Sequence, residues 1–165
     1  MALITLGANS GKGKVLQVVT ATKTDTFTTS STSNVTITGL EVNITPSSTS
    51  SKIFLSASVN IAESGSGGDF NLNIFRDSTN ILLGDTAGNR TRTFSDLQSA
   101  STGNTNNVAP VVLDSPSTTS QITYSIKGMV NAGTVTGYVN RSSVDSNSSD
   151  YDRCASSITV MEIAG

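Results

Sequence analysis

The stretch CASSITVMEI, residues 154–163, is the part of this chain that decides its fold. It contains neither Gly nor Pro, and its β-branched residues favour an extended strand. Side chains of a strand alternate between two faces, and here both faces carry apolar groups. One face carries Ile158 and Val160, and the other carries Thr159, Met161 and Ile163. We therefore expect this strand to lie in the middle of the structure, covered on both sides.

The rest of the chain consists of further strand-like segments separated by turn-forming residues. We expect strands at residues 14–20, 24–29, 35–37, 40–45, 52–61, 70–76, 81–84, 108–113, 121–127 and 135–140. Gly39 predicts a bulge or a bend. Residues 77–80 predict a tight turn that joins 70–76 and 81–84 in a hairpin, and residues 135–140 are a plausible partner for 121–127. This pattern predicts an all-β fold, an antiparallel β-sandwich of the jelly-roll type with about ten strands.

The composition excludes several classes of function. A net charge of −2 argues against a surface that binds nucleic acid. The absence of His removes His bases, Ser–His triads and His-ligated metals, and we expect neither enzymatic activity nor a cofactor. Cys154 is the single cysteine, so no disulfide forms within the chain, and we expect a small buried thiol.

Nothing in the sequence predicts a membrane segment or a disordered chain. No apolar run approaches the roughly 20 residues of a membrane helix. Residues 1–6 are too short and lack the basic residues of a secretory signal, so we expect synthesis in a cytoplasm. The 27 Ser and 24 Thr residues, with only 13% charged residues, resemble a disordered composition, but the alternating apolar runs favour an ordered β protein.

Residues 1–13 form an arm in our interpretation, and residues 14–165 form the β domain. Three glycines and several polar residues make the arm a flexible spacer, and its tip carries the apolar Leu3, Ile4 and Leu6. Two interpretations stay open, namely docking of this tip on a neighbouring protein and a frayed terminus.

The loop at residues 145–152 is rich in oxygen ligands, which Ca²⁺ prefers. It misses the spacing of an EF-hand, so the pattern favours a solvated turn over a metal site. Arg141 and Arg153 flank this loop, and salt bridges to Asp150 and Asp152 would pin it. Such pairs contribute about 0–1 kcal/mol at a surface, and more at a subunit contact. Plain solvent exposure of these four side chains is the alternative.

Residues 85–92 form a second polar loop. Its charged and amide side chains suit a contact with a glycan or another subunit, and a simple surface loop is the alternative. These side chains are Asp85, Asn89, Arg90 and Arg92.

Five blocks, in this order, carry a resemblance to a known family. They are GKVLQVV with TKTDTF (13–19 and 22–27), ITPSSTSSKI (44–53), GD with GNR (84–85 and 88–90), LDSP (113–116), and YVNR with 155–163. Together they resemble small β domains in structural proteins of tailed phages, which are especially frequent in marine phages. The match covers nearly the whole chain from Gly13 onward.

The resemblance implies a structural protein on the surface of a virion, often a tail-fibre component, and commonly a homotrimer. Its partners would be copies of itself, another virion protein and a host-surface glycan or protein, with no nucleic acid and no membrane insertion. Family members usually carry the domain after a longer anchoring region, whereas about a dozen residues precede it here. This departure favours a small separate subunit, so two functions stay open: a tail-fibre or receptor-binding component, and a capsid decoration protein.

A trimer would cover the second face of the last strand, which would then point toward the threefold axis. We expect Leu3, Ile4 and Leu6 to anchor the protein on the virion. The residues expected at the trimer interface are Arg141, Arg153, Ile158, Val160, Met161 and Ile163.

Overall fold

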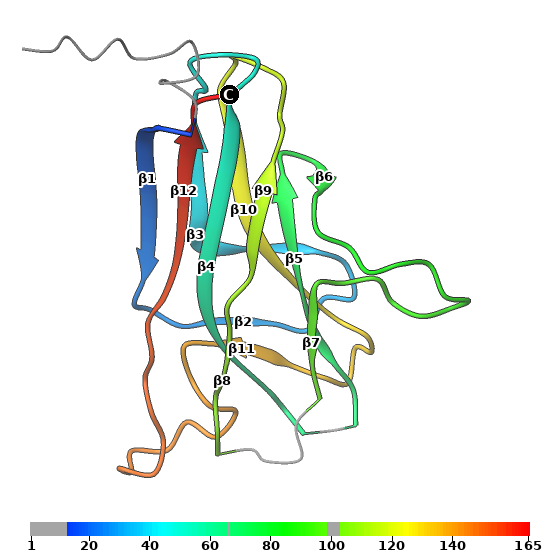
Figure 1. The fold of residues 1–165 in the computed structure, drawn as a ribbon. Helices are drawn as coiled ribbons and strands as arrows, with labels where there is room; N and C mark the ends of the chain where they lie inside the picture. Colours follow the sequence, from blue (N-terminus) through cyan, green and yellow to red (C-terminus); the bar gives the residue numbers. More distant parts are fainter. Residues whose placement is uncertain (1–12, 66, 99–102) are drawn as a thin grey trace, which may run out of the picture.

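The structure, a computed structural model, describes residues 13–65, 67–98 and 103–165 and is all-β there (Figure 1). Leu3, Ile4 and Leu6 lie outside these ranges. No helix long and apolar enough to cross a membrane is present in the described ranges. The strands are β1 (Val15–Lys23), β2 (Phe27–Thr29), β3 (Val35–Ile44), β4 (Lys52–Glu63), β5 (Phe70–Arg76), β6 (Thr79–Asn80), β7 (Ser95–Leu97), β8 (Asn106–Val108), β9 (Val111–Asp114), β10 (Ile122–Val130), β11 (Gly137–Val139) and β12 (Ser156–Ile163).

These strands form two antiparallel sheets with one core between them. The first sheet has the order β1-β12-β4-β11-β2, with β8 and β9 on the other edge of β4. The second sheet has the order β3-β10-β5-β6, with β7 paired to β5. Buried side chains from both sheets join a single apolar cluster. The predicted all-β class with antiparallel sheets is therefore confirmed, and the arrangement is that of a β-sandwich.

Alternation along β4 and β5 builds much of the core. Five β4 side chains, every second residue from Ile53 to Ile61, are at most 5% exposed, as their spacing predicts. Phe70, Leu72 and Ile74 of β5 are completely buried opposite them. Burying an apolar side chain of this size contributes about 1.5–3 kcal/mol.

Phe70 fits the core closely because two glycines lie against its ring. A Cβ atom added to Gly128 would lie 2.7 Å from the ring, and one added to Gly137 would lie 2.2 Å from it. Gly128 belongs to β10 in the second sheet and Gly137 to β11 in the first, so this contact ties the two sheets together.

β12 lies between β1 and β4, as expected of a strand in the middle of a sheet. Its inward side chains are buried, and its outward side chains are half-buried. The core of this chain therefore covers the inward face of β12 completely, but the outward face is only partly covered. The inward residues are Ser156, Ile158, Val160 and Glu162, and the outward ones are Ser157, Thr159, Met161 and Ile163.

Three expectations about strands need correction. Residues 137–139 pair with β2 and β4, not with β10, because β3 and β5 already occupy both edges of β10. The strand expected at 108–113 is broken into β8 and β9 at Pro110, which has no N–H for a ladder. The strand expected at 81–84 is replaced by the two-residue β6, which pairs with β5 within the residues expected to form the turn.

The bulge predicted at Gly39 is confirmed. Gly39 has a φ of 87°, a left-handed conformation that glycine adopts without a steric penalty. In the pairing of β3 with β10, Thr36 lies opposite Lys127 and Glu41 lies opposite Ser125. Only Ile126 of β10 therefore faces residues 37–40 of β3, and the bulge bends the strand there.

Candidate functional site

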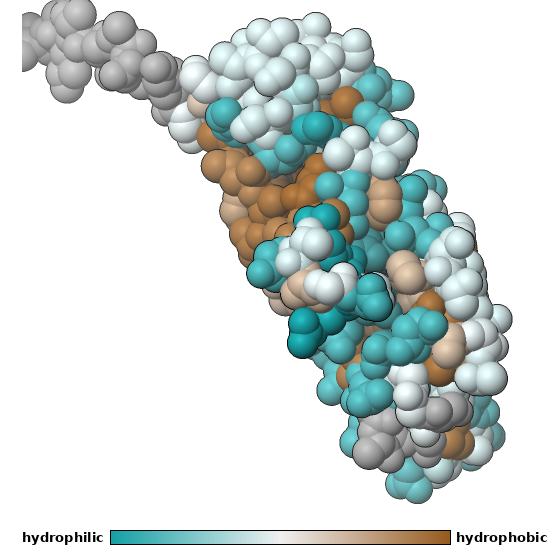
Figure 2. Space-filling model, turned by 90° about the vertical axis from the view of Figure 1, so that its right-hand side faces the viewer, coloured by the Kyte–Doolittle hydropathy of each residue, from teal (hydrophilic) through white to brown (hydrophobic). Residues whose placement is uncertain are grey.

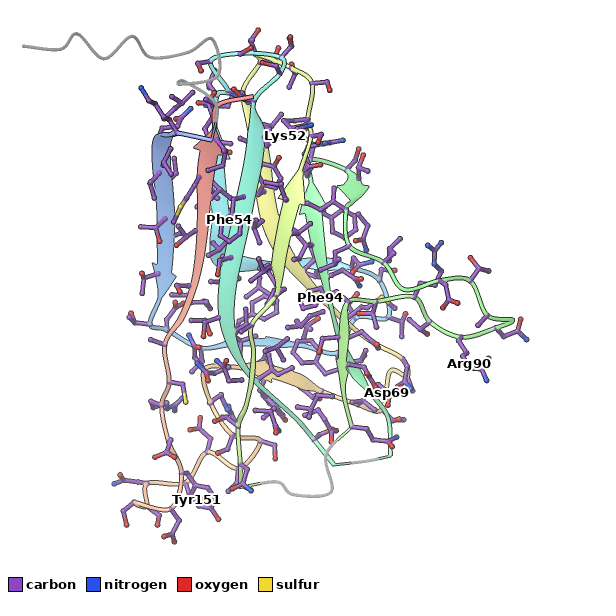
Figure 3. All side chains as sticks on the ribbon, in the orientation of Figure 1. Lys52, Phe54, Asp69, Arg90, Phe94 and Tyr151 are labelled. Atoms are coloured by element: carbon purple, nitrogen blue, oxygen red, sulfur yellow. The ribbon has the colours of Figure 1, made fainter. Side chains whose placement is uncertain are left out.

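The loop between β11 and β12 forms the lower end of the molecule in Figure 1. Its side chains line a polar pocket that is open to solvent. The pocket has a volume of about 260 Å³. Tyr151, labelled in Figure 3, lies at this end. The residues that line the pocket are Asp145, Ser146, Asn147, Ser148, Tyr151 and Arg153.

Asn140 fixes the base of this loop. Its side-chain Nδ2 donates to the carbonyl oxygens of Lys23 (2.8 Å) and Asp25 (3.0 Å). Its Oδ1 accepts a 2.6 Å hydrogen bond from Ser156 Oγ, and its backbone N–H donates to Asn60 O. Asn140 is fully buried and has a φ of 61°, which asparagine tolerates better than most residues. The two ends of the loop then meet at a backbone bridge between residues 141 and 153.

Asp145 is the carboxylate that holds the loop together. Its Oδ2 lies 3.1 Å from Arg141 Nη1, and its Oδ1 lies 2.5 Å from Arg153 Nη2. The prediction that both arginines pin the loop is thus correct, but their partner is Asp145 where Asp150 and Asp152 were expected. Asp145 can reach both guanidinium groups because residues 141 and 153 are adjacent at the bridge.

The two arginines have different surroundings. Arg141 also donates to the carbonyl oxygens of Ser142 and Ser143, and its guanidinium lies over the ring of Tyr138 at 4.6 Å. This side chain is 17% exposed, so its role is structural. The side chain of Arg153 is 56% exposed and lines the pocket.

The pocket suits a hydroxyl-rich ligand better than a cation. Arg153 supplies N–H donors, the serines and Asn147 supply donors and acceptors, and Tyr151 adds an aromatic surface. Two guanidinium groups already neutralise Asp145, which weakens it as a cation ligand. Across the described residues, no three His, Cys, Asp or Glu side chains form a group able to hold a metal ion.

The second predicted loop, residues 85–92, lies between β6 and β7 and projects from another side of the molecule (Figure 3). All four of its singled-out residues are exposed. Arg92 Nε donates to Gly84 O at 2.7 Å, and Arg90 Nη1 donates to Ala87 O within its own turn. The structure does not bring Asp85, Asn89, Arg90 and Arg92 near the pocket, as the separated labels of Arg90 and Tyr151 show.

The residues expected at a trimer interface are spread over three places. Ile158 and Val160 are 0% exposed within the sandwich, so they have no surface left for a second chain. Met161 and Ile163 lie half-buried on the outer face of β12. Arg141 and Arg153 lie beyond the opposite end of that strand. The structure therefore does not unite this set into one surface.

Sequence reasoning missed two polar clusters, one buried and one half-buried. In the first, Glu162 Oε1 accepts hydrogen bonds from Ser47 N, Ser47 Oγ and Ser51 Oγ, and Oε2 accepts one from Gln17 Nε2. Burial opposes the charged form, but these hydrogen bonds outweigh it and lower the pKa of Glu162 to about 2. A carboxylate so acidic and so fully bonded is a structural clasp, because an acid–base catalyst needs a pKa near the working pH.

The second cluster joins the two sheets. Tyr124 OH of β10 donates to Asp114 Oδ2 of β9 at 2.7 Å, and Arg76 Nη1 of β5 binds both oxygens of Asp114 at 2.8 and 2.9 Å. Burial and the hydrogen bond to Asp114 raise the pKa of Tyr124 well above its usual range. The three residues of this cluster come from segments far apart in sequence, so no local motif indicates the cluster.

Cys154 precedes β12 and is half-buried, less covered than expected, with its Sγ 3.6 Å from Thr105 Oγ1.

No protein-family model matches this chain, and no curated protein sequence matches it either.

Proposed function

We propose that this chain is a non-enzymatic structural protein of a phage virion. It assembles as a homotrimer on the particle surface and serves as a tail-fibre or receptor-binding component. The ordered sequence blocks that resemble phage β domains support this proposal, as does the all-β sandwich. The polar pocket next to β12 would contact a host-surface glycan.

The observation that carries the proposal is the separation of the chain's entry point from the pocket. Gly13, where the described chain begins, donates its N–H to Ala164 O beyond the end of β12. The pocket residues precede the start of β12. The two are thus separated by the length of an eight-residue strand, about 25 Å. A protein held to a particle through residues 1–12 would present the pocket outward.

A binding experiment tests this function. The full chain is applied to an array of immobilised bacterial surface glycans, together with the Arg153→Ala and Tyr151→Ala variants. We expect the wild type to bind a subset of glycans and each variant to lose at least tenfold in affinity, because both side chains line the pocket. The matched control is Arg90→Ala, an exposed arginine in the other loop, which should bind like the wild type. Absence of glycan binding by the wild type, or equal losses in all three variants, would contradict the receptor-binding role.

Capsid decoration is the second candidate, and the weakly charged composition rich in Ser and Thr favours it. Such a surface suits a protein displayed in many copies without self-repulsion. Copy number separates the two roles, and it is measured by gel densitometry of purified particles. Hundreds of copies per particle would indicate decoration, and tens of copies would indicate a tail component.

A further inference from the structure

The outer face of the first sheet carries an apolar row that runs across four strands. Val18 of β1 pairs with Met161 of β12, Met161 pairs with Phe54 of β4, and Phe54 pairs with Leu113 of β9. All four side chains lie on the side away from the core, and Val18 and Leu113 are 54% and 60% exposed. Register alone brings these residues together, since they are far apart in sequence.

Further apolar residues extend this row into a patch. Seven large hydrophobic side chains are exposed among the described residues, and five of them belong to β1 or β9. Figure 2 shows apolar atoms gathered most densely in the upper half of the molecule. We call this patch the outer apolar face, and it consists of Val15, Leu16, Val18, Phe54, Val111, Leu113, Met161 and Ile163.

The other half of the same sheet surface is polar. Below the row, Thr20 Oγ1 and Thr159 Oγ1 are hydrogen-bonded at 3.0 Å. Lower still, Asn107 Nδ2 donates to Ser58 Oγ at 2.9 Å and to Asn60 Oδ1 at 3.2 Å. The apolar residues are therefore concentrated and not scattered singly, and a contiguous exposed patch of this kind marks an interaction site.

We propose that a second copy of this chain packs against the outer apolar face. This inference deepens the homotrimer proposed above and rests on it for the number of copies. The interface it assigns differs from the one expected from sequence: it keeps Met161 and Ile163, omits the core residues Ile158 and Val160, and adds side chains of β1, β4 and β9.

Charge and symmetry favour a copy of the same chain over a different partner. Among the outward residues of these four strands, Lys52 is the single charge, and its Nζ donates to Ser115 Oγ at the border of the patch. Identical faces can thus meet without burying like charges. Rotation about an axis parallel to the strands places apolar half against apolar half and polar half against polar half.

The same rotation places every chain entry at one end and every pocket at the other, as a domain fixed on a surface requires. Four strands span about 14 Å between the outermost strand axes, and the apolar row crosses all four.

Light scattering coupled to size-exclusion chromatography of the full chain, over a micromolar dilution series, tests the inference. We expect the wild type to be oligomeric, and Leu113→Asp and Val18→Asp each to raise the dissociation constant at least tenfold. Circular dichroism should show an unchanged β signal. Matched controls are Thr38→Asp and Thr79→Asp at exposed positions of the second sheet, away from the proposed interface, which should associate like the wild type.

If the aspartate variants do not fold, Leu113→Ser supplies a milder substitution at a side chain that is 60% exposed. Hydrogen exchange of the wild type then gives a second readout, with amides of β1 and β9 better protected at high concentration. A monomeric wild type, or equal dissociation in the second-sheet variants, would overturn the inference. An oligomer lost on deleting residues 1–12 but kept in Leu113→Asp would also overturn it. Loss of glycan binding by an intact oligomer would instead remove only the receptor-binding role.

Discussion

Glu162 Oε1, near the end of β12, accepts a 2.7 Å hydrogen bond from the backbone nitrogen of Ser47, 115 residues away in the chain. The side chain of Ser47 donates to the same oxygen at 2.6 Å. Glu162 lies on the same inward face of β12 as Ile158 and Val160, yet it is charged and only 1% exposed. The turn between β3 and β4 therefore closes the end of the core by donating hydrogen bonds to the buried carboxylate of Glu162.

The stability of the protein should fall in acid because of this carboxylate. The pKa of Glu162 is about 2 in the folded chain and 4.5 ordinarily, so its contribution is complete above pH 4.5 and is lost as the pH falls toward 2. We expect Glu162→Gln to cost about 1–3 kcal/mol at pH 7 and to flatten the stability profile between those values. Urea unfolding at a series of pH values measures both effects. Glu41→Gln, at an exposed position of β3, is the control, and an equal change in both variants would argue against the clasp.

Gly137 should tolerate no side chain. An added Cβ would lie 2.2 Å from the ring of Phe70, which is completely buried and cannot move aside freely. We expect Gly137→Ala to destabilise the fold by roughly 1–3 kcal/mol or more through overpacking. Gly133→Ala is the matched control, since no atom lies within 4 Å of its added Cβ. Thermal denaturation of both variants compares them, and similar melting temperatures would show that the core can relax around Phe70.

Asn140 should contribute through both its hydrogen bonds and its backbone conformation. Asn140→Gly removes the three side-chain bonds but fits the φ of 61°, whereas Asn140→Ala also adds steric strain. We expect both variants to have a lower free energy of unfolding than the wild type, and Asn140→Ala to be less stable than Asn140→Gly by about 1 kcal/mol. Chemical denaturation gives the two free energies of unfolding. If Ala proved the more stable variant, backbone strain at this position would be disproved.

Tyr124 should stay protonated in the folded protein well beyond its ordinary pKa of 10. Because the folded pKa is raised, its contribution to stability is complete below pH 10 and is lost as the pH rises above it. We expect Tyr124→Phe to cost about 1–2 kcal/mol at neutral pH, since Asp114 loses one hydrogen bond but keeps Arg76. It should also remove a late step from the alkaline absorbance titration. Tyr138→Phe serves as the control, since it keeps the ring beneath Arg141, and persistence of the late step in Tyr124→Phe would refute the assignment.

Local patterns in the sequence predicted the strands that are long and regular. The alternation of β4 and the limits of β5 were correct because an apolar side chain at every second position has one favourable face. Gly39 was correctly assigned to a bulge for a similarly local reason. The partner of β11 was wrong, because which strand edge is free depends on the whole sheet order and not on the segment itself.

The candidate site shows the same division. The polarity of the loop before β12 was evident from its residues, but the choice of Asp145 as the shared carboxylate depends on the bridge between residues 141 and 153. A pattern of charges in a sequence gives no distances. Several aspartates in one loop are therefore equally good candidates for the ion pairs until the path of the backbone is known.

The stretch at residues 154–163 shows what each level decides. Its β-branched, Gly-free sequence was sufficient to determine a strand with apolar side chains on both faces, because that property is local. Tertiary structure decided that the face with Ile158 and Val160 belongs to the core and that Glu162 on it is clasped by a distant turn. It also decided that Met161 joins Val18, Phe54 and Leu113 in an exposed row. Register between distant strands sets such neighbours, and no single strand contains that information.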